Sequence, residues 1–163
     1  MPVTFSNVSP YVLQRQQWVP RPIEDVFAFF SDAKNLEEIT PAWLGFRILS
    51  PEPIVLRPEA RIHYRISLHG LPLRWVTEIE SWDPPYEFVD VQARGPYRLW
   101  HHTHSFEPVD GGTLMRDLVR YVLPFGLLGR LAHAWLVKPD LEAIFDYRAL
   151  RMSEVLGPCC AHE

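Results

Sequence analysis

Five side chains that can carry acid–base or charge chemistry fall at alternating positions in segments with strand character. His102 and His104 are two residues apart, which places both on one face of a strand. The same alternation gives Asp90 and Arg94 a shared face on one strand, and it turns Asp117 inward on another. A histidine held by an aspartate can move protons near neutral pH, so His102, His104 and Asp117 are the candidate catalytic residues.

Three interpretations of these residues stay open. His102 or His104 with Asp117 could enolise or dehydrate a bound molecule while Arg94 holds one of its oxygens. The same groups could only orient a ligand. They could also form an internal network in which Arg94 bonds to Asp117 or Asp90 and the histidines stay neutral. Unpaired buried charge costs several kcal/mol, which favours the network.

Metal and cofactor chemistry have little support in the sequence. His102, His104 and Asp117 could in principle ligate zinc, but nothing else points to a metal, and we predict none. The chain has no Gly-rich phosphate loop, CxxC pair or nucleophile elbow, so we predict no cofactor.

The elements that must position these residues follow from hydrophobic periodicity and turn signals. Pro22 opens a short helix, a second short helix covers 32–39, and a long helical pattern runs over 127–156. Pro139 lies inside this last pattern, so we expect a kink or break near Val137. Strands are predicted at 11–19, 46–49, 61–68, 73–82, 87–94, 97–107 and 113–123, the last two joined by the hairpin signal at 110–112.

This order predicts an α+β fold in which a curved antiparallel sheet of about seven strands wraps around a long C-terminal helix. We expect one domain over 1–163, with 1–9 and 157–163 as flexible tails. A curved sheet closed by one helix leaves a hollow, and the parity of the strands predicts its lining. The predicted ligand-binding residues are Tyr64, Trp75, Thr77, Asp90, Gln92, Arg94, Trp100, His102, His104, Asp117, Tyr121 and Trp135, although the aromatic ones also fit plain core packing.

Several strings carry a resemblance to a known superfamily. They include VFAFFSDAKNL at 26–36, ITPAWLGF at 39–46, GLPLRW at 70–75, WHHTHSF at 100–106 and DLVRY at 117–121. With these strings the chain resembles the START-like (SRPBCC) superfamily over about residues 10–152, and more narrowly its bacterial, polyketide cyclase/dehydrase-like ligand-binding proteins. The resemblance implies a helix-grip fold with a cavity, but no particular reaction. Glu59, where relatives tend to have glycine, and Pro139 depart from the pattern.

Binding or carrying a small hydrophobic molecule, such as a lipid, quinone or polyketide, is therefore the first functional hypothesis. A cyclase or dehydratase-like enzyme is the second. A protein-interaction module with a filled core and an exposed apolar patch is the third. We leave turnover undecided and expect a monomer or homodimer.

Composition excludes several other classes. The 163 residues carry a net charge of −4 and no basic run, so no nucleic-acid partner is predicted. No stretch reaches the roughly 18–20 apolar residues of a membrane span, and the first ten residues do not read as a signal peptide. Cys159 and Cys160 are adjacent and cannot frame a fold, which favours a reducing, cytoplasmic setting.

Overall fold

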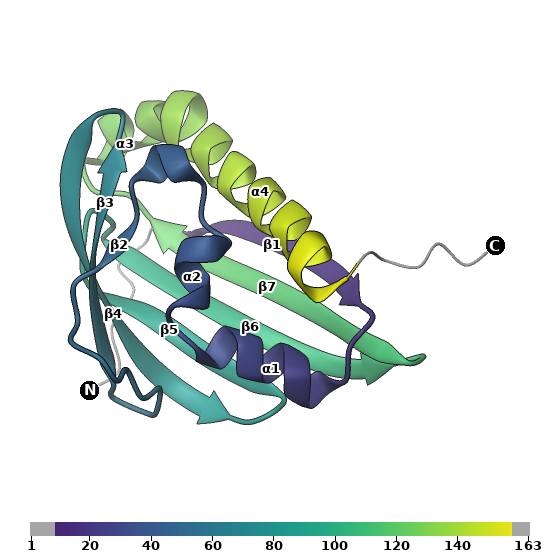
Figure 1. Ribbon diagram of the computed structural model, residues 1–163. Helices are drawn as coiled ribbons and strands as arrows, with labels where there is room; N and C mark the ends of the chain where they lie inside the picture. Colours follow the sequence, from purple (N-terminus) through teal and green to yellow (C-terminus); the bar gives the residue numbers. More distant parts are fainter. Residues whose placement is uncertain (1–8, 158–163) are drawn as a thin grey trace.

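A seven-stranded antiparallel sheet forms the body of the molecule. The computed structural model describes residues 9–157 (Figure 1). The strands lie in the order β1-β7-β6-β5-β4-β3-β2. Their bounds are β1 (Tyr11–Val19), β2 (Arg47–Ile48), β3 (Arg61–Leu68), β4 (Leu71–Asp83), β5 (Glu87–Arg94), β6 (Leu99–Val109) and β7 (Gly112–Val122). The predicted sheet is thus confirmed. The cysteines and most of both predicted tails lie outside the described residues.

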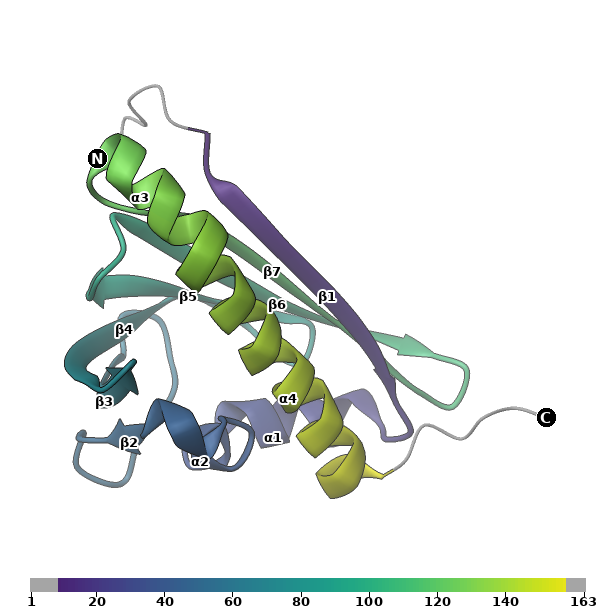
Figure 2. The same cartoon turned by 90° about the horizontal axis from the view of Figure 1, so that it is seen from above.

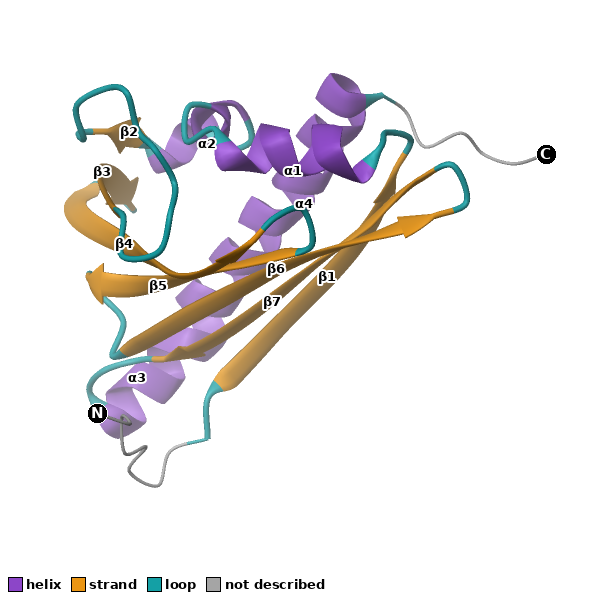
Figure 3. Ribbon diagram, turned by 90° about the horizontal axis from the view of Figure 1, so that it is seen from below, coloured by secondary structure: helices purple, strands orange, loops and turns teal. Residues whose placement is uncertain are grey.

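The helices lie on the same side of the sheet (Figures 2 and 3). The short α1 (Ile23–Ser31) buries Ile23, Val26, Phe27 and Phe30, the positions that helical spacing assigned to one face. It is followed by α2 (Asn35–Glu38) and the 3₁₀ turn η1 (Ala42–Leu44). The long α4 (Lys138–Leu156) crosses the sheet diagonally, which confirms the predicted helix-grip arrangement. No helix among the described residues has the length and apolar character needed to span a bilayer.

The predicted break before Pro139 takes the form of a π-helical turn. The short α3 (Gly126–Ala132) runs into η2 (His133–Val137), a π-helical segment, and α4 follows directly. Proline has no N–H to donate to the carbonyl four residues earlier, and a π turn is one of the recognised ways in which a helix absorbs such a defect. The helical path therefore continues, but its side-chain phase changes at η2.

Glu59 adopts the backbone conformation that glycine would favour. Its φ is +66°, in the left-handed region, and its N–H donates to the carbonyl of Ile79 at 2.8 Å. The turn before β3 therefore keeps the geometry suited to a glycine, even though a bulkier residue occupies it.

Three apolar clusters surround a central space. One packs α1 and Met152 of α4 against Phe88, Phe106 and Met115 of the sheet. A second joins β1 and β7 to Leu141 and Phe145 of α4, and a third gathers Leu44, Ile66 and Trp75 at the other end of the sheet. The core is thus divided, and a cavity lies between its parts.

Candidate ligand cavity

A cavity of about 180 Å³ lies between the sheet and α4. Strands β3 to β6 form one wall, α4 forms the opposite wall, and α1, α2 and η1 supply residues from the side. Its lining is largely apolar and aromatic: Phe30, Leu36, Thr40, Leu44, Phe46, Leu56, Ile62, Tyr64, Ile66, Leu68, Trp75, Thr77, Ile79, Phe88, Asp90, Tyr97, Trp100, His102, His104, Val137, Asp140, Leu141, Ile144, Phe145 and Arg148.

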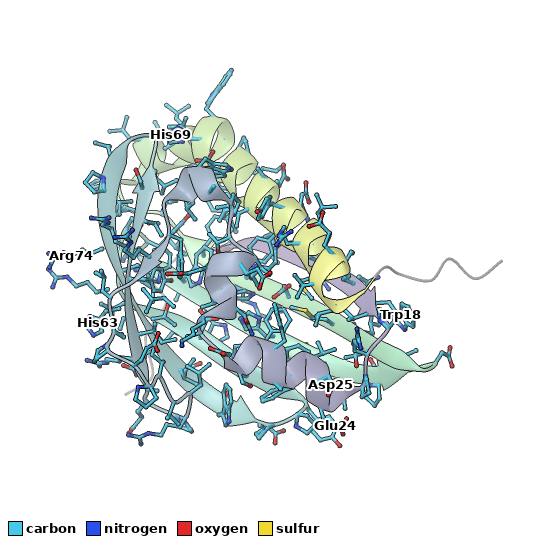
Figure 4. The ribbon with its side chains drawn as sticks, viewed as in Figure 1. Trp18, Glu24, Asp25, His63, His69 and Arg74 are labelled. Atoms are coloured by element: carbon cyan, nitrogen blue, oxygen red, sulfur yellow. The ribbon has the colours of Figure 1, made fainter. Side chains whose placement is uncertain are left out.

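The alternation of side chains along each strand determines which residues of the sheet line the cavity. On β3 and β4 the predicted inward residues line the cavity, whereas His63 and Arg74 between them point outward (Figure 4). Seven of the twelve predicted ligand-binding residues lie in the wall: Tyr64, Trp75, Thr77, Asp90, Trp100, His102 and His104. Their placement in the wall agrees with the parity argument, while a role in binding stays a prediction.

Gln92 and Arg94 do not line the cavity. Val76 pairs with Arg94 and Thr77 with Gln92, so Ala93 is an extra residue on β5 and the alternation breaks there. Arg94 is consequently exposed and forms no part of the buried charge cluster. Gln92 instead closes a local turn, donating to the Tyr97 carbonyl at 2.7 Å and accepting from the Tyr97 N–H at 3.1 Å.

Trp135, Tyr121 and Asp117 also lie outside the main cavity. Trp135 is 80% exposed and continues the solvent-facing stripe of Leu128 and Leu131 on α3, so the whole apolar face predicted to point inward here points away from the sheet. Tyr121 is buried, and its hydroxyl hydrogen-bonds to His133 at 2.9 Å. Asp117 is buried under α4, where it borders a separate hollow of about 40 Å³.

Two aspartates and two histidines form a buried cluster at the inner wall. The register sets Asp90 opposite His102 and His104 opposite Asp117 on neighbouring strands. His102 Nε2 lies 2.8 Å from Asp117 Oδ1, and His104 Nε2 lies 2.8 Å from Asp90 Oδ2. The second nitrogens lie 3.5 Å from Asp90 and 3.0 Å from Asp117, but the latter contact lacks hydrogen-bond geometry. The two rings lie with their centres 3.7 Å apart and their planes tilted by 36°.

The electrostatics of the cluster distribute the protons unequally. Burial and the neighbouring His104 lower the pKa of His102, despite the two aspartates. Burial would also lower the pKa of His104, but the close contact with Asp117, the hydrogen bond with Asp90 and the attraction of both charges outweigh it and raise that pKa. The histidines hold the pKa of both carboxyls below their usual range, against the effect of burial. These directions favour two carboxylates and place the proton of the cluster on His104 rather than on His102.

Arg148 supplies the remaining positive charge, and sequence reasoning missed it. It borders both hollows from α4, and its guanidinium carbon lies 4.8 Å from the centre of the Phe145 ring. Its Nε and Nη1 are buried and have no hydrogen-bond acceptor among the described residues. When His104 carries its proton, Arg148 brings the charges in this region to a sum of zero. The signal was present in the sequence, because Arg148 interrupts the apolar stripe of Leu141, Phe145 and Met152 at helical spacing.

The cluster also brings together potential metal ligands. Donor atoms of Asp90, His102 and His104 lie within 4.8 Å of one another. At either Nε2 atom an ion would have to replace a histidine–carboxylate hydrogen bond of 2.8 Å, whereas His104 Nδ1 has no hydrogen-bond partner among the described residues.

The opposed pKa shifts predict that the cluster's contribution to the free energy of unfolding is greatest near pH 6.5, about the ordinary histidine pKa. The pKa of His102 is lowered in the folded state, so its contribution to the free energy of unfolding is lost as the pH falls below the ordinary histidine pKa. His104 has a raised pKa, so its contribution is lost as the pH rises through its folded-state pKa. Urea unfolding between pH 5 and 9 measures how the free energy of unfolding falls on each side of this maximum. His102→Gln should reduce the fall on the acidic side, and His104→Gln the fall on the alkaline side. A wild-type stability that does not vary across this range would contradict the assignment.

A curved sheet gripping a long helix, with a cavity between them, is the helix-grip fold of START-like (SRPBCC) proteins. Residues 19–143 match the family model described as polyketide cyclase / dehydrase and lipid transport, and the chain belongs to this family. No curated protein matches the sequence. Family and fold together indicate a hydrophobic-ligand-binding architecture.

Several solved structures share the fold at low sequence identity. Ms6760 from Mycobacterium smegmatis is 17% identical, with a TM-score of 0.65 over 89% of this chain and 90% of that one. CV1439 from Chromobacterium violaceum is 13% identical, with a TM-score of 0.67 over 92% and 100%. Ara h 8.0201 is 15% identical, with a TM-score of 0.59 over 89% and 99%. At these identities the likeness establishes the fold and leaves the ligand to be argued from the cavity.

Proposed function

We propose that this protein binds or carries a small, mostly apolar molecule in the cavity, with an acceptor oxygen of that molecule placed at Arg148. The observation that carries the proposal is an apolar cavity of about 180 Å³ with a guanidinium in its wall whose buried Nε and Nη1 have no acceptor within residues 9–157. Pockets of this kind, apolar with a few polar groups, are typical of small-molecule sites.

The apolar lining favours a compact ring system or a short branched chain. A dry cavity of about 150 Å³ already accepts benzene in an engineered protein, so the space here suits a molecule of similar or modestly larger size. Aromatic side chains such as Trp75, Trp100 and Tyr97 meet edge to face along the wall and offer flat surfaces for a planar ligand.

The polar end of the ligand follows from the charges around Arg148. A buried donor without a partner costs about 1–3 kcal/mol, so an oxygen that accepts from Nε or from Nη1 would recover the cost of that one donor. Because the charges of the cluster and Arg148 already sum to zero, a neutral carbonyl or hydroxyl oxygen adds no uncompensated charge. The favoured ligand is therefore apolar and carries at least one such oxygen.

Two probes that differ only in one carbonyl test this proposal. 2-Acetylnaphthalene should bind wild-type protein about tenfold or more tightly than 2-ethylnaphthalene, because a hydrogen bond to a charged donor contributes about 1.5–3 kcal/mol. Arg148→Met should remove this preference while the oxygen-free probe still binds. Calorimetric titration measures both affinities.

Arg151→Met is the matched control for this titration, since Arg151 lies on the same helix but pairs with Glu38 at the surface. The control should keep the preference for the ketone. Equal affinity of wild type for the two probes would contradict the proposed hydrogen bond from Arg148. No binding of either probe would contradict the binding function.

One observation favours proton transfer as a second candidate function. Asp90, His102 and His104 all line the cavity, so a bound ketone would lie beside an aspartate–histidine pair. Asp90 would take a proton from the carbon next to the carbonyl, and the enolate oxygen would accept from Arg148. Exchange of the methyl protons of bound 2-acetylnaphthalene for deuterium, slowed in Asp90→Asn, would distinguish this activity from binding alone.

A further inference from the structure

An apolar ridge projects from the helical arm that α3 and η2 form before α4. We call Phe125, Leu127, Leu128, Leu131 and Trp135 the α3 ridge, and their exposed fractions lie between 55% and 82%. Leu127, Leu128, Leu131 and Trp135 follow helical spacing and so form one stripe. Figure 2 shows α3 at one end of the molecule, at the opposite end of the helical path from the last turn of α4. Contiguous apolar exposure of this kind marks an interaction surface.

The ridge faces solvent because the opposite side of the helix is built for close packing. A side chain at Gly129 would place its Cβ 2.2 Å from the carbonyl oxygen of Pro124, so only glycine fits there. His133 stacks on Tyr11 with the ring centres 3.5 Å apart and hydrogen-bonds to Tyr121. Small and polar residues therefore hold the arm against the protein, and large apolar ones point away, the reverse of an ordinary surface helix.

The charges around the ridge select its partner. Residues 124–139 include Arg130 and Lys138 but no aspartate or glutamate, in a chain with 20 acidic residues and a net charge of −4. Lys138 lies 4.0 Å from Glu142 on α4, but Arg130 has no acid beside it within 124–139, and a symmetric dimer through the ridge would bring two copies of Arg130 toward each other. An anionic surface, in contrast, complements them.

We propose that the α3 ridge docks on a phospholipid membrane that contains anionic lipid. Leucine, phenylalanine and tryptophan on one helical face, with basic residues beside them, are the composition of helices that lie in a membrane interface. Val137 and Leu141, which follow Trp135 by two and six residues, line the cavity. Docking would therefore place the end of the cavity formed by η2 and α4 near the lipid.

Sedimentation with vesicles tests the docking surface independently of any cavity ligand. Wild-type protein should bind vesicles of phosphatidylcholine mixed with phosphatidylglycerol, and bind phosphatidylcholine alone more weakly. Leu128→Glu and Trp135→Glu should each weaken binding to the mixed vesicles by about tenfold or more, because each replaces an inserting side chain with an acid. Leu150→Glu and Val55→Glu, at exposed apolar residues elsewhere, should leave binding within about twofold of wild type.

Three outcomes would overturn the docking proposal. One is no binding of wild type to either vesicle. Another is equal loss of binding in the ridge and control variants, with thermal unfolding confirming that all are folded. The third is a dimer in solution, seen by light scattering, that dissociates in the ridge variants, which would make a second copy the occupant. Normal probe binding by the ridge variants keeps this test separate from that of the cavity.

Discussion

Asp117→Ala is expected to lower the free energy of unfolding by about 3–5 kcal/mol, the usual cost of removing one partner from a buried ion pair. Asp117 is 6% exposed, and it holds His102 at 2.8 Å and lies 3.0 Å from the charged His104. Without it, His104 keeps only Asp90 as a carboxylate partner, and His102 loses its hydrogen bond at Nε2. Urea unfolding at pH 7 measures the difference.

Asp146→Ala provides the comparison for this variant. Asp146 pairs with Arg15 at 3.4 Å, but its side chain is 69% exposed, so the change should cost less than about 1 kcal/mol. A loss of stability in Asp117→Ala no larger than in Asp146→Ala would show that the cluster is not a buried charge network.

Ile144→Trp is expected to abolish measurable binding of 2-acetylnaphthalene. Ile144 lines the cavity from α4, and an indole in place of the isoleucine side chain would occupy much of the space of about 180 Å³. Because the added atoms enter a cavity rather than a filled core, the free energy of unfolding should change by less than the 1–3 kcal/mol typical of overpacking. Calorimetric titration and urea unfolding measure the two effects.

Leu150→Trp is the control for this substitution, since Leu150 lies on the same helix and is exposed. It should bind the probe as wild type does. Unchanged affinity in Ile144→Trp would move the binding site away from the cavity, and severe destabilisation would indicate that the space near Ile144 is too small for a ligand.

Most of the fold could be predicted because its signals are local. The bounds of β1, β3 and β5 agree with the segments of apolar alternation, and the turn at Asp110 and Gly111 closes β6 on β7 with the positive φ angles typical of a hairpin. Alternation also sufficed for the cavity residues of β3 and β4, because no bulge interrupts the pairing between these two strands.

The site was less accessible to sequence reasoning, because its contacts depend on register and helical phase. One extra residue on β5 turned Arg94 to the surface, and the apolar stripe of α3 and η2 that carries Trp135 faces solvent instead of the sheet. The counter-charge came instead from Arg148, on an element distant in sequence from the acids. Periodicity marked its position but could not show which side chains the helix would meet.

The interaction-module hypothesis needs a partial correction. It expected a filled core together with an exposed apolar patch, but the structure has both a cavity and a patch. The two features lie along one helical path, from the α3 ridge through η2 to the cavity wall on α4. They are therefore compatible with one protein that holds a small molecule and docks on a membrane.

Native mass spectrometry tests the central claim, that the cavity holds one small apolar molecule. Wild type and Ile144→Trp would be compared as freshly purified and after addition of excess 2-acetylnaphthalene. The account predicts one retained molecule per wild-type chain, either copurified or added, and none in Ile144→Trp. No retained molecule in wild type under either condition, or equal retention by the two proteins, would contradict it.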